Sequence, residues 1–517
     1  MSQRPSYYVT TPIYYVNDVP HIGHAYTTLA CDVMARFKRL DGFDVMFLTG
    51  TDEHGQKVEK SAEKAGLAPL EFCDKVSARF QDLASAMNFS NDQFIRTTED
   101  RHKKAVQHLW QKLVEKGFIY EDKYAGWYSV RDEAFYGEKE LVEGENGQKQ
   151  APTGAPVEWV EEPSFFFKLS AMEDQLLALY REQPDFVMPK SRLNEVKSFV
   201  EGGLQDLSIS RTTFSWGVPV PGNEGHIMYV WIDALTNYLT ATGYPNTEGA
   251  DYQKFWPASL HMIGKDILRF HAVYWPAFLL AADLPLPERV FAHGWWTNEG
   301  QKISKSLGNV IDPFELIESY GLDEVRYFLL REVPFGNDGD FSRRSFVLRC
   351  NADLANGLGN LAQRTLSMIH KNCDAVIPIS GVLSNEDNDL LKGIDQTLDI
   401  VRGHMDNQAF HAAFGAIFNQ AAVADTYISV QEPWKLRKTD PERMNTVLYV
   451  LAEVIRQLAI LIQPIMPDSA DKLLNQLCVS ERGFEQLGVA GRLLSGTEIP
   501  KPEGVFPRLE LPEITEA

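Results

Sequence analysis

A short histidine-containing segment near the start of the chain has the residue types and spacing to bind a phosphate. Residues 20–24 read PHIGH, so His21 and His24 lie three residues apart on one face of the helix predicted to begin there. Backbone N–H groups at a helix start favour phosphate, and imidazoles could donate to phosphoryl oxygens whose charge rises in a transition state. Gly23 would let a flat group approach closely. The alternative is that the histidines only cap or pack the helix.

A second segment, far along the chain, is rich in lysine, serine and glycine. Residues 300–309 read GQKISKSLGN, with Lys302 and Lys305 three apart and Ser304 and Ser306 on either side of Lys305. Such a loop could close over a polyphosphate, although a pair of solvated surface charges has the same pattern. The spacing G-x-x-x-x-G-K-[ST] occurs nowhere in the chain, which excludes a P-loop nucleotide hydrolase.

The elements predicted around the histidines indicate a parallel sheet. Residues 6–10 (SYYVT) and 45–49 (VMFLT) are β-branched, aromatic and apolar, which predicts two strands. Residues 22–40 have the spacing of an amphipathic helix that Pro20 starts and that ends near Gly42. Strand, helix and strand form a βαβ unit, so we expect an α/β fold with a doubly wound parallel sheet.

The remainder of the chain divides into an acidic insertion, a second α/β part and a helical part. Residues 121–162 hold eleven acidic and four basic side chains, a net charge of 4 − 11 = −7, and predict a small irregular insertion. Strand and helix patterns resume at residues 229–239 and 260–280. After about Phe341 strand patterns nearly vanish.

Long amphipathic patterns in this last part predict a helical bundle. They cover residues 351–372, 384–406 and 444–462. The apolar stretch 447–466 is interrupted by charged and amide side chains, so it predicts a buried helix and no membrane span.

Length, composition and cysteine content bound the class of protein. The 517 residues suggest about three domains, and 44% hydrophobic with 23% charged residues is an ordinary globular composition, which excludes disorder. Five scattered cysteines with no CxxC pair argue against a disulfide framework or a zinc site built from cysteines, and indicate a reducing compartment. Residues 1–10 lack the apolar core of a signal peptide, so we expect a cytoplasmic location.

Together, HIGH (residues 21–24) and KISKS (residues 302–306) resemble the paired signatures of the class I aminoacyl-tRNA synthetases, whose second signature reads KMSKS. The resemblance implies amino-acid activation with ATP as its Mg²⁺ complex. The carboxylate attacks the α-phosphate, pyrophosphate leaves, and the aminoacyl adenylate esterifies the tRNA end. The residues that it assigns to catalysis, by positioning reactants and stabilising charge, are His21, His24, Lys302 and Lys305.

Four further segments narrow the resemblance to the methionyl-tRNA synthetases over nearly the whole chain. They are residues 11–17 (TPIYYVN), 47–55 (FLTGTDEHG), 229–234 (YVWIDA) and 263–267 (IGKDI). Aromatic rings suit a polarizable thioether, and a carboxylate could hold the substrate ammonium, although any one aromatic residue could be an ordinary core residue. The family's methionine pocket falls on Ile13, Tyr15, Asp52, Trp231, Ala234, Tyr238, Ile267 and His271, with Asp52 at the ammonium.

The resemblance also implies a nucleotide site and an anticodon site. Asn and Arg can read unstacked bases and a Trp can stack on one, unless the Trp belongs to the core. The residues expected around ATP are His21, Gly23, His24, Gly264, Asp266, His293, Gly294, Lys302, Ser304, Lys305 and Ser306. Those expected at the CAU anticodon are Trp434 and the stripe Asn356, Asn360 and Arg364, at i, i+4 and i+8 of one predicted helix.

The same family implies a domain plan. A Rossmann-like catalytic domain would span residues 1–117 and 216–296, split by a connective insertion at 118–215. Next would come residues 297–345, which hold the signature loop and a stem-contact region. A helical anticodon-binding domain would span residues 346–517. Residues 118–215 contain no cysteine, whereas many relatives bind zinc there, so we expect no structural zinc. A C-terminal module of dimeric relatives is missing, so we expect a monomer that binds methionine, ATP and tRNA(Met) and no membrane.

Three other functions fit parts of the pattern. A cysteinyl-tRNA synthetase would need a zinc site that the scattered cysteines do not build. Nucleotidylyltransferases share HxGH but are much shorter, and would leave the helical part unexplained. A non-catalytic RNA-binding protein descended from a synthetase has no need of pyrophosphate ligands, so the intact histidines and lysines of both signatures argue against it.

The charge of the chain is unevenly distributed. With 50 basic and 71 acidic residues the formal net charge is −21, which in bulk argues against a nucleic-acid partner. Two basic stretches could nevertheless contact phosphates while the acidic remainder repels other RNA, which predicts selective, salt-sensitive tRNA binding. Their members are Arg326, Arg331, Arg343, Arg344 and Arg349 in the first, and Lys435, Arg437, Lys438 and Arg443 in the second.

Overall fold

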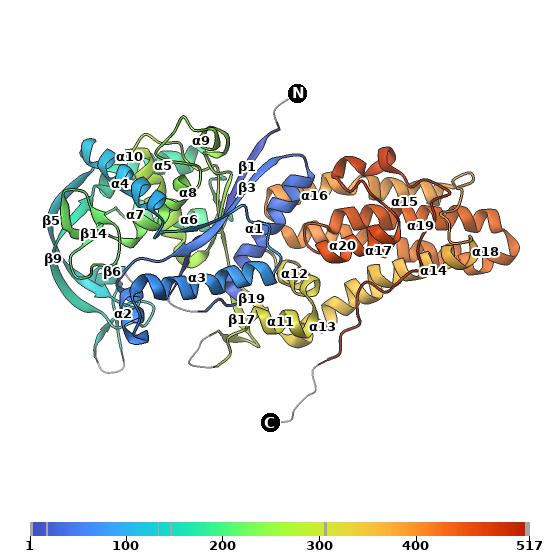
Figure 1. Ribbon diagram of the computed structural model, residues 1–517, viewed down its shortest axis with the longest axis horizontal. Helices are drawn as coiled ribbons and strands as arrows, with labels where there is room; N and C mark the ends of the chain where they lie inside the picture. Colours follow the sequence, from blue (N-terminus) through green and yellow to red (C-terminus); the bar gives the residue numbers. More distant parts are fainter. Residues whose placement is uncertain (1–3, 17–18, 133, 145–146, 304–307, 512–517) are drawn as a thin grey trace. The chain divides into compact units, whose positions relative to one another are not determined.

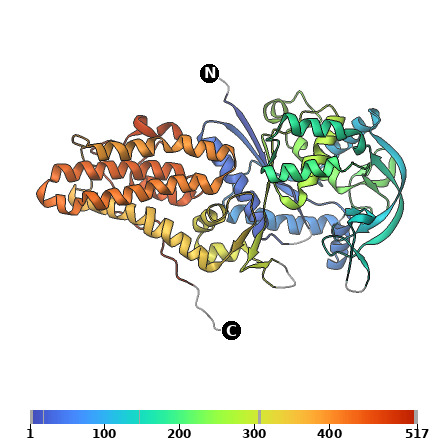
Figure 2. The same cartoon turned by 180° about the vertical axis from the view of Figure 1, so that it is seen from behind.

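The computed structural model describes residues 4–16, 19–132, 134–144, 147–303 and 308–511 (Figure 1, Figure 2). The chain forms two compact units. The sheet unit comprises Ser6–Pro20 and Val45–Ala292, and the helical unit comprises Met1–Pro5, His21–Asp44 and His293–Ala517. The histidine segment therefore begins a helix of the helical unit, although the strands before and after it belong to the sheet unit.

A parallel sheet forms the centre of the sheet unit. Its seven strands among the described residues have the order β10-β16-β15-β1-β3-β2, with β4 beside β3. The pairs β1–β15, β10–β16, β2–β3 and β3–β4 run parallel. The predicted Rossmann-like core and both predicted strands are confirmed. The bounds are β1 Ser6–Thr10, β2 Tyr14–Tyr15, β3 Asp44–Asp52, β4 Gln93–Arg96, β10 Val187–Met188, β15 Leu260–Gly264 and β16 Val290–His293.

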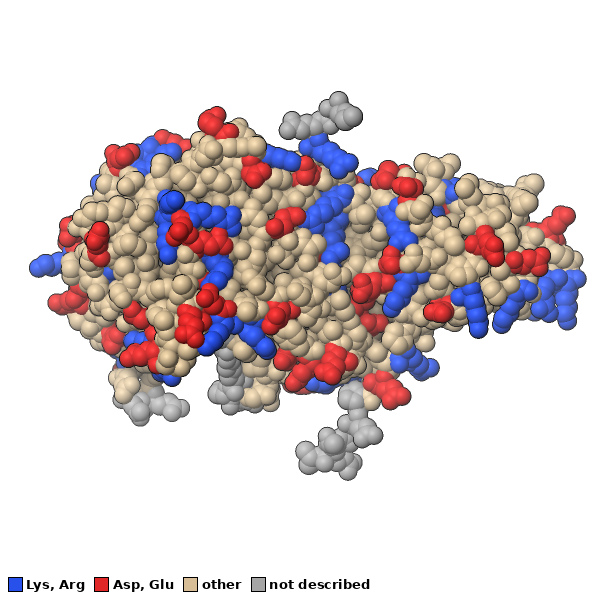
Figure 3. Space-filling model, viewed as in Figure 1, with Lys and Arg blue, Asp and Glu red and all other residues tan. Residues whose placement is uncertain are grey.

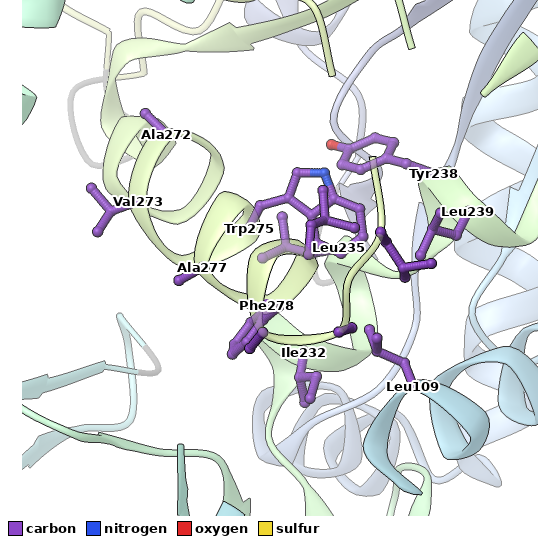
Figure 4. Close-up of a cluster of buried hydrophobic side chains, with 14 of the residues drawn as sticks. Leu109, Ile232, Leu235, Tyr238, Leu239, Ala272, Val273, Trp275, Ala277 and Phe278 are labelled. Carbon is purple, nitrogen blue, oxygen red and sulfur yellow. The ribbon is translucent and has the colours of Figure 1, made fainter. Parts of the chain in front are cut away.

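Apolar helices complete a hydrophobic core with this sheet. Figure 4 shows Leu235, Tyr238 and Trp275 gathered in that core with Leu109 of α4. Each large apolar side chain that is fully buried stabilises the fold by about 1.5–3 kcal/mol. The core thereby fixes the segments in which we expect the methionine pocket. The helices are α4 Asp100–Glu115, α7 Val230–Leu235, α8 Asn237–Thr240 and α10 Trp275–Ala281.

The acidic insertion is more regular than the sequence predicted. Strands β5 (Ile119–Ser129) and β9 (Glu158–Phe167) pair antiparallel along most of their length. The sheet has the order β11-β9-β5-β6, with β6 at Ala134–Tyr136 and β11 at Leu207–Ser208. The prediction of irregular structure is wrong because the acids hide a strand pattern. Glu121 and Asp122 are exposed on β5, whereas Tyr128 and Phe167 are buried. Adjacent residues of a strand point to opposite faces, so this end of β5 is solvated on both faces and accommodates these charges.

The helix that begins at the histidines is held in the helical unit by a buried ion pair. α1 spans Ile22–Leu40, as predicted. Its Asp32 carboxylate accepts from Arg326 Nη2 at 2.6 Å, and both side chains are 0% exposed. Arg326, in α12 (Leu322–Arg331), also donates to two main-chain carbonyl groups, those of Pro464 and Ile465. These bonds tie α1 to α12 and to the segment between the last two helices of the bundle.

The predicted bundle is confirmed, but two of its predicted helices are interrupted. Residues 384–406 are divided at Gln396, and residues 351–372 begin with a π-helix, η6 (Asn351–Gly359), in which Gly357 is non-helical. The spacing of apolar residues continues across both breaks, so periodicity alone does not reveal them. The bounds are α14 Asn360–Asn372, α15 Asn385–Asp395, α16 Thr397–Asp406, α17 Phe410–Gln431, α18 Pro433–Thr439, α19 Pro441–Ile462 and α20 Pro467–Gln476.

Helix α19 is a core helix of the bundle. Within the described part of the chain it is the one helix long and apolar enough to cross a membrane, and 89% of its apolar window is buried inside the protein. The predicted buried helix is confirmed. Its fully buried Glu453 accepts from Arg456 and from Arg492, at 2.7 and 3.0 Å. These arginines compensate the charge that interrupts the apolar sequence.

Candidate active site

The two histidines of residues 20–24 close the start of α1 through a reciprocal cap. His21 Nδ1 accepts from the backbone N–H of Gly23, and the backbone N–H of His21 donates to His24 Nδ1, each at 3.1 Å. In a neutral imidazole whose Nδ1 accepts a hydrogen bond, the proton is on Nε2. Each ring therefore caps the helix with one nitrogen and presents a donor on the other. Capping and phosphate binding are compatible because they use different nitrogens.

Burial sets the charge and packing of this pair. Burial, and then the neighbouring His21, hold the pKa of His24 well below its ordinary value, so that ring is neutral at pH 7. The ring centroids of His21 and His24 lie 3.9 Å apart. A Cβ on Gly23 would lie 2.9 Å from His21 Cε1. The space beside Gly23 thus accommodates the His21 ring.

His293 and Gly294 anchor α1 from the other side. His293 Nδ1 donates to the Gly294 carbonyl at 2.8 Å, and its Nε2 is hydrogen-bonded at 2.7 Å to the Thr27 hydroxyl, which also donates to the Gly23 carbonyl at 3.1 Å. The buried His293 ring also packs edge-on against Tyr26 at 5.1 Å. A Cβ on Gly294 would lie 2.2 Å from the Asn337 carbonyl oxygen, so only glycine permits this approach. Both residues therefore support the helix that carries His21 and His24.

Lys302 lies at the base of the second signature. It ends the short strand β18 (Gln301–Lys302), which pairs antiparallel with β17 (Trp296–Asn298). Its exposed ammonium lies 5.9 Å from the centre of the Trp295 ring. Trp296 contacts Tyr26 of α1 at 5.5 Å, which links this hairpin to the histidine helix. Ser304, Lys305 and Ser306 lie outside the described residues.

The residues expected at methionine gather in the sheet unit. Ile13, Tyr15, Trp231 and Ala234 belong to one apolar cluster. Tyr15 on β2 lies opposite the buried Asp52 at the carboxyl end of β3. Trp231 stacks on Phe270 with ring centroids 3.5 Å apart. The structure therefore brings a carboxylate and two aromatic rings to one edge of the sheet.

Three more of these residues form a hydrogen-bonded chain. His271 Nδ1 donates to the Ile267 carbonyl at 3.0 Å, so His271 Nε2 accepts from the Tyr238 hydroxyl at 2.7 Å. Burial lowers the pKa of His271 to about 4, which keeps the ring neutral at pH 7. Ile13, Trp231 and Ile267 pack against the core that contains Tyr238. The pocket residues thus have fixed rotamers and one defined tautomer.

Two buried groups behind this pocket escaped the sequence analysis. His261 accepts from Trp275 Nε1 at 3.3 Å and is hydrogen-bonded to the Thr10 hydroxyl at 2.8 Å, and its ring packs in a tilted arrangement against Tyr238 with centroids 4.1 Å apart. The second group is the carboxylate of Asp233, the residue directly before Ala234 in the sequence. It is hydrogen-bonded to His54 at 2.6 Å and to His102 at 2.8 Å. The available signals were a histidine in the apolar run LHMIG and an aspartate in YVWIDAL.

Gly264 and Asp266 follow the carboxyl end of another strand. Gly264 ends β15, and Asp266 lies in the 3-10 turn η3 (Lys265–Ile267) directly after it. Ligands of parallel sheets bind beyond the carboxyl ends of the strands. These two residues belong to the sheet unit, whereas the other residues expected at ATP belong to the helical unit.

Two of the four residues expected at the anticodon are in contact. The Arg364 guanidinium of α14 lies 5.5 Å from the centre of the Trp434 ring, and Trp434 at the start of α18 is 41% exposed. Asn360 is exposed one turn before Arg364 on α14. Asn356 is exposed in η6, across the break at Gly357, so the predicted stripe is not one continuous helix. Figure 3 shows basic side chains at the end of the bundle where α18 lies, which carries Lys435, Arg437 and Lys438.

The chain is similar to known proteins along nearly its whole length. The family model "tRNA synthetases class I (M)" matches residues 7–366, and "Anticodon binding domain of methionyl tRNA ligase" matches residues 377–516. The chain is 58% identical to the methionine–tRNA ligase of Brucella suis over 507 residues, 98% of each chain. It is 56% identical to that of Rhizobium meliloti over 515 residues, 99% of this chain and 100% of the relative.

Solved structures of methionyl-tRNA synthetases are also similar to this chain. A Mycobacterium tuberculosis methionyl-tRNA synthetase in complex with methionyl-adenylate has a TM-score of 0.95 and 54% identity, covering 98% of this chain and 100% of that one. The apo form from the same organism has a TM-score of 0.90 and 51% identity, covering 99% of both chains. From the matched family models and these relatives, the chain belongs to the methionyl-tRNA synthetases, the class I methionine–tRNA ligases.

Proposed function

We propose that the residues described above ligate methionine to tRNA(Met) in two steps, with ATP as the energy source. A methionine carboxylate oxygen bonds to the α-phosphorus, the bond from that phosphorus to the bridging oxygen breaks, and pyrophosphate leaves. A ribose hydroxyl at the tRNA end then attacks the carbonyl carbon of the adenylate and loses its proton as AMP leaves. The side chains position the reactants and stabilise charge without forming covalent bonds.

The nucleotide would be held chiefly by residues of the helical unit. We assign the Nε2–H donors of His21 and His24 to phosphate oxygens, and Lys302 and Lys305 to the charge of the departing pyrophosphate. Gly264, Asp266, His293, Gly294, Ser304 and Ser306 complete the proposed ATP set. Within the described ranges no group of three or more His, Cys, Asp or Glu side chains is placed to hold a metal. Mg²⁺ would therefore arrive with ATP, where it supplies charge neutralisation to the phosphates.

Methionine would bind at the pocket of the sheet unit. Asp52 would accept from the substrate ammonium, a charge-assisted hydrogen bond, and the rings of Tyr15, Trp231 and Tyr238 would surround the thioether. Ile13, Ala234, Ile267 and His271 complete the proposed set. The observation that supports the assignment is a combination of three features. The Tyr238–His271 hydrogen bond is neutral, Tyr15 and Trp231 belong to one apolar cluster, and the carboxylate of Asp52 is buried.

A pyrophosphate-exchange assay tests this function. Purified protein should exchange labelled pyrophosphate into ATP when methionine is present, and should then charge tRNA(Met). Exchange that responds to leucine or cysteine but not to methionine would contradict the substrate. Exchange without any charging of tRNA would contradict the second step.

We also propose that the enzyme acts as a cytoplasmic monomer. Cys31, Cys73 and Cys350 are buried free thiols, which suits a reducing compartment. Light scattering after size exclusion should give a mass near 58.4 kDa, the mass of one chain. A mass of twice that value at micromolar concentration would contradict the monomer.

A further inference from the structure

The structure separates the arginines of residues 326–349 into paired and unpaired ones. Arg326 is fully buried against Asp32, and Arg349 bonds to Glu332 at 2.9 Å and lies 3.7 Å from Asp353. Neither side chain is free to bind a phosphate. The buried Arg326 therefore does not belong to the basic stretch predicted to contact phosphates, and Arg349 is engaged by carboxylates of its own unit. Arg331, Arg343 and Arg344 remain as candidates for a phosphate contact.

Arg331 is the unpaired arginine with a defined surrounding. It is the last residue of α12, and its Nε is buried with no hydrogen-bond partner among the described residues. The adjacent carboxylate, Glu332, is already bound by Arg349. A buried donor without an acceptor costs about 1–3 kcal/mol. Such a group calls for a functional explanation, and a ligand that supplies an acceptor is one.

A second polar atom without a described partner lies near Arg331, on the neighbouring helix. His411 lies in the first turn of α17, and its Nδ1 is also buried without a described partner. Burial, then Arg331, then His404 lower the pKa of His411, which places the Arg331 guanidinium and the His404 ring near it. No described carboxylate is among the groups that shift it. The positive charge of the Arg331 guanidinium beside this ring favours an anion.

The packing of α12 on α17 explains why these donors meet. Tyr327 contacts Phe418 at 4.9 Å, and one turn further along α12 Arg331 reaches Gly415. A Cβ on Gly415 would lie 3.9 Å from Arg331 Nη2, so the glycine leaves the helix surface bare below the guanidinium. His411 is one turn before Gly415 on the same face of α17. Arg331, His411 and the bare surface of Gly415 form what we call the α12–α17 site.

We propose that the α12–α17 site binds a phosphodiester group of the tRNA backbone. The proposal rests on the proposed function, because tRNA is the polyanion which that function brings to the helical unit. A guanidinium fork matches two phosphate oxygens and an imidazole N–H can donate to one. Both residues are partly exposed although Arg331 Nε and His411 Nδ1 themselves are buried, so a phosphate would approach from the exposed side of each residue.

Phosphate contacts leave a measurable signature in salt. Each neutralised phosphate contributes about −0.7 to −0.9 to the slope of log K against log salt concentration. In the full chain, Arg331→Gln should weaken binding of tRNA(Met) about tenfold near 0.1 M KCl and make that slope less steep by about one. Arg331→Lys should retain the slope because it retains the charge. His411→Gln should weaken binding in the same direction, and by less in the Arg331→Gln background.

Controls separate this site from a general loss of fold or function. Methionine-dependent pyrophosphate exchange needs no tRNA, so its kcat and its KM for methionine should be unchanged in every variant. Arg181→Gln, at an exposed arginine of the sheet unit, should leave the salt slope unchanged. An unchanged slope in Arg331→Gln, or an equal loss of exchange activity, would overturn the proposal. Absence of exchange in the wild-type chain would instead overturn the proposed function.

A free phosphate ion has the same chemistry, so its binding needs a separate measurement. Inorganic phosphate at about 10 mM should raise the Tm of wild type and of Arg331→Gln equally, because one ion lacks the other contacts of tRNA. Stabilisation that disappears in Arg331→Gln, together with an unchanged tRNA salt slope, would assign the site to a free anion and overturn the tRNA assignment.

Discussion

At the residue scale, the proposed site depends on neutral histidines whose tautomers are set by their partners. His21, His24, His271 and His293 each use one ring nitrogen on a main-chain group, which determines the nitrogen that carries the proton. Burial lowers the pKa of His24 and of His271, so these two stay uncharged at pH 7. Donors that are oriented before the substrate arrives need no reorganisation during the reaction.

The hydroxyl of Tyr238 should contribute to methionine binding through His271. Tyr238→Phe removes the donor to His271 Nε2, which is worth about 1 kcal/mol, or roughly fivefold. We expect KM for methionine to rise by about that factor in pyrophosphate exchange, with KM for ATP unchanged. Tyr244→Phe is the matched control, because the Tyr244 hydroxyl is buried without a described partner. Equal effects of the two variants would refute a specific role for Tyr238.

Asp233 should make stability depend on pH. Burial raises its pKa, but His54 and His102 together bring it down to about 2, below the ordinary 3.8. A depressed pKa means that this stabilisation is present above pH 3.8 and is lost as the pH falls through 2. The difference corresponds to about 2 kcal/mol at pH 7 and to about half of that at pH 3. Urea unfolding measures the free energy of unfolding of wild type and of Asp233→Asn. The difference between the two should narrow as the pH falls from 7 to 3, and a difference that stays constant would contradict the depressed pKa of Asp233.

At the element scale, the sequence predicted the helices and strands whose ends are determined by neighbouring residues. The helix from Ile22 to Leu40 and the strand from Ser6 to Thr10 have the predicted bounds, because their starts and periodicity are written in neighbouring residues. The pairing of Thr10 with His261 joins residues 251 positions apart, and no single-sequence pattern reports it. The antiparallel ribbon of the insertion was missed because its acidic residues interrupt the alternation that is typical of a strand.

The buried pair Asp32–Arg326 should be the strongest polar link between α1 and α12. Asp32→Ala leaves Arg326 buried without its counter-charge, so we expect a loss of about 3–5 kcal/mol in the free energy of unfolding. Asp41→Ala removes the partner of the half-exposed Arg402 and should cost about 1 kcal/mol or less. Chemical denaturation measures both. A double variant, Asp32→Leu with Arg326→Met, should recover much of the loss, and failure to do so would point to the carbonyl contacts of Arg326 instead.

Helix α18 should act on tRNA and not on adenylate formation. Trp434 is exposed beside Arg364, so Trp434→Ala should reduce kcat/KM for tRNA(Met) by about tenfold or more, the loss of one stacked base. Pyrophosphate exchange should be unaffected. Trp159→Ala, at a Trp of similar exposure on the insertion, is the control and should leave charging intact. Loss of exchange in Trp434→Ala would indicate a structural tryptophan.

At the scale of the whole molecule, the net charge of −21 and the binding of a polyanion are reconciled by where the cations lie. Arg326 and Arg349 neutralise carboxylates inside the helical unit, as Arg456 and Arg492 do. Helix α18 carries further basic side chains, which Figure 3 shows at its end of the bundle. A negative remainder then disfavours contacts made elsewhere on the surface.

This distribution predicts a shallow salt dependence for tRNA binding. If Lys435, Arg437 and Lys438 of α18 and Arg331 each neutralise one phosphate, the slope of log K against log salt concentration should be roughly −3. Filter binding of tRNA(Met) between 50 and 400 mM KCl measures it, while pyrophosphate exchange in the same buffers should change little. A slope near −8 would require many more phosphate contacts than these helices offer. A slope near zero would mean that recognition depends on base contacts alone and that the basic side chains of α18 serve only solubility.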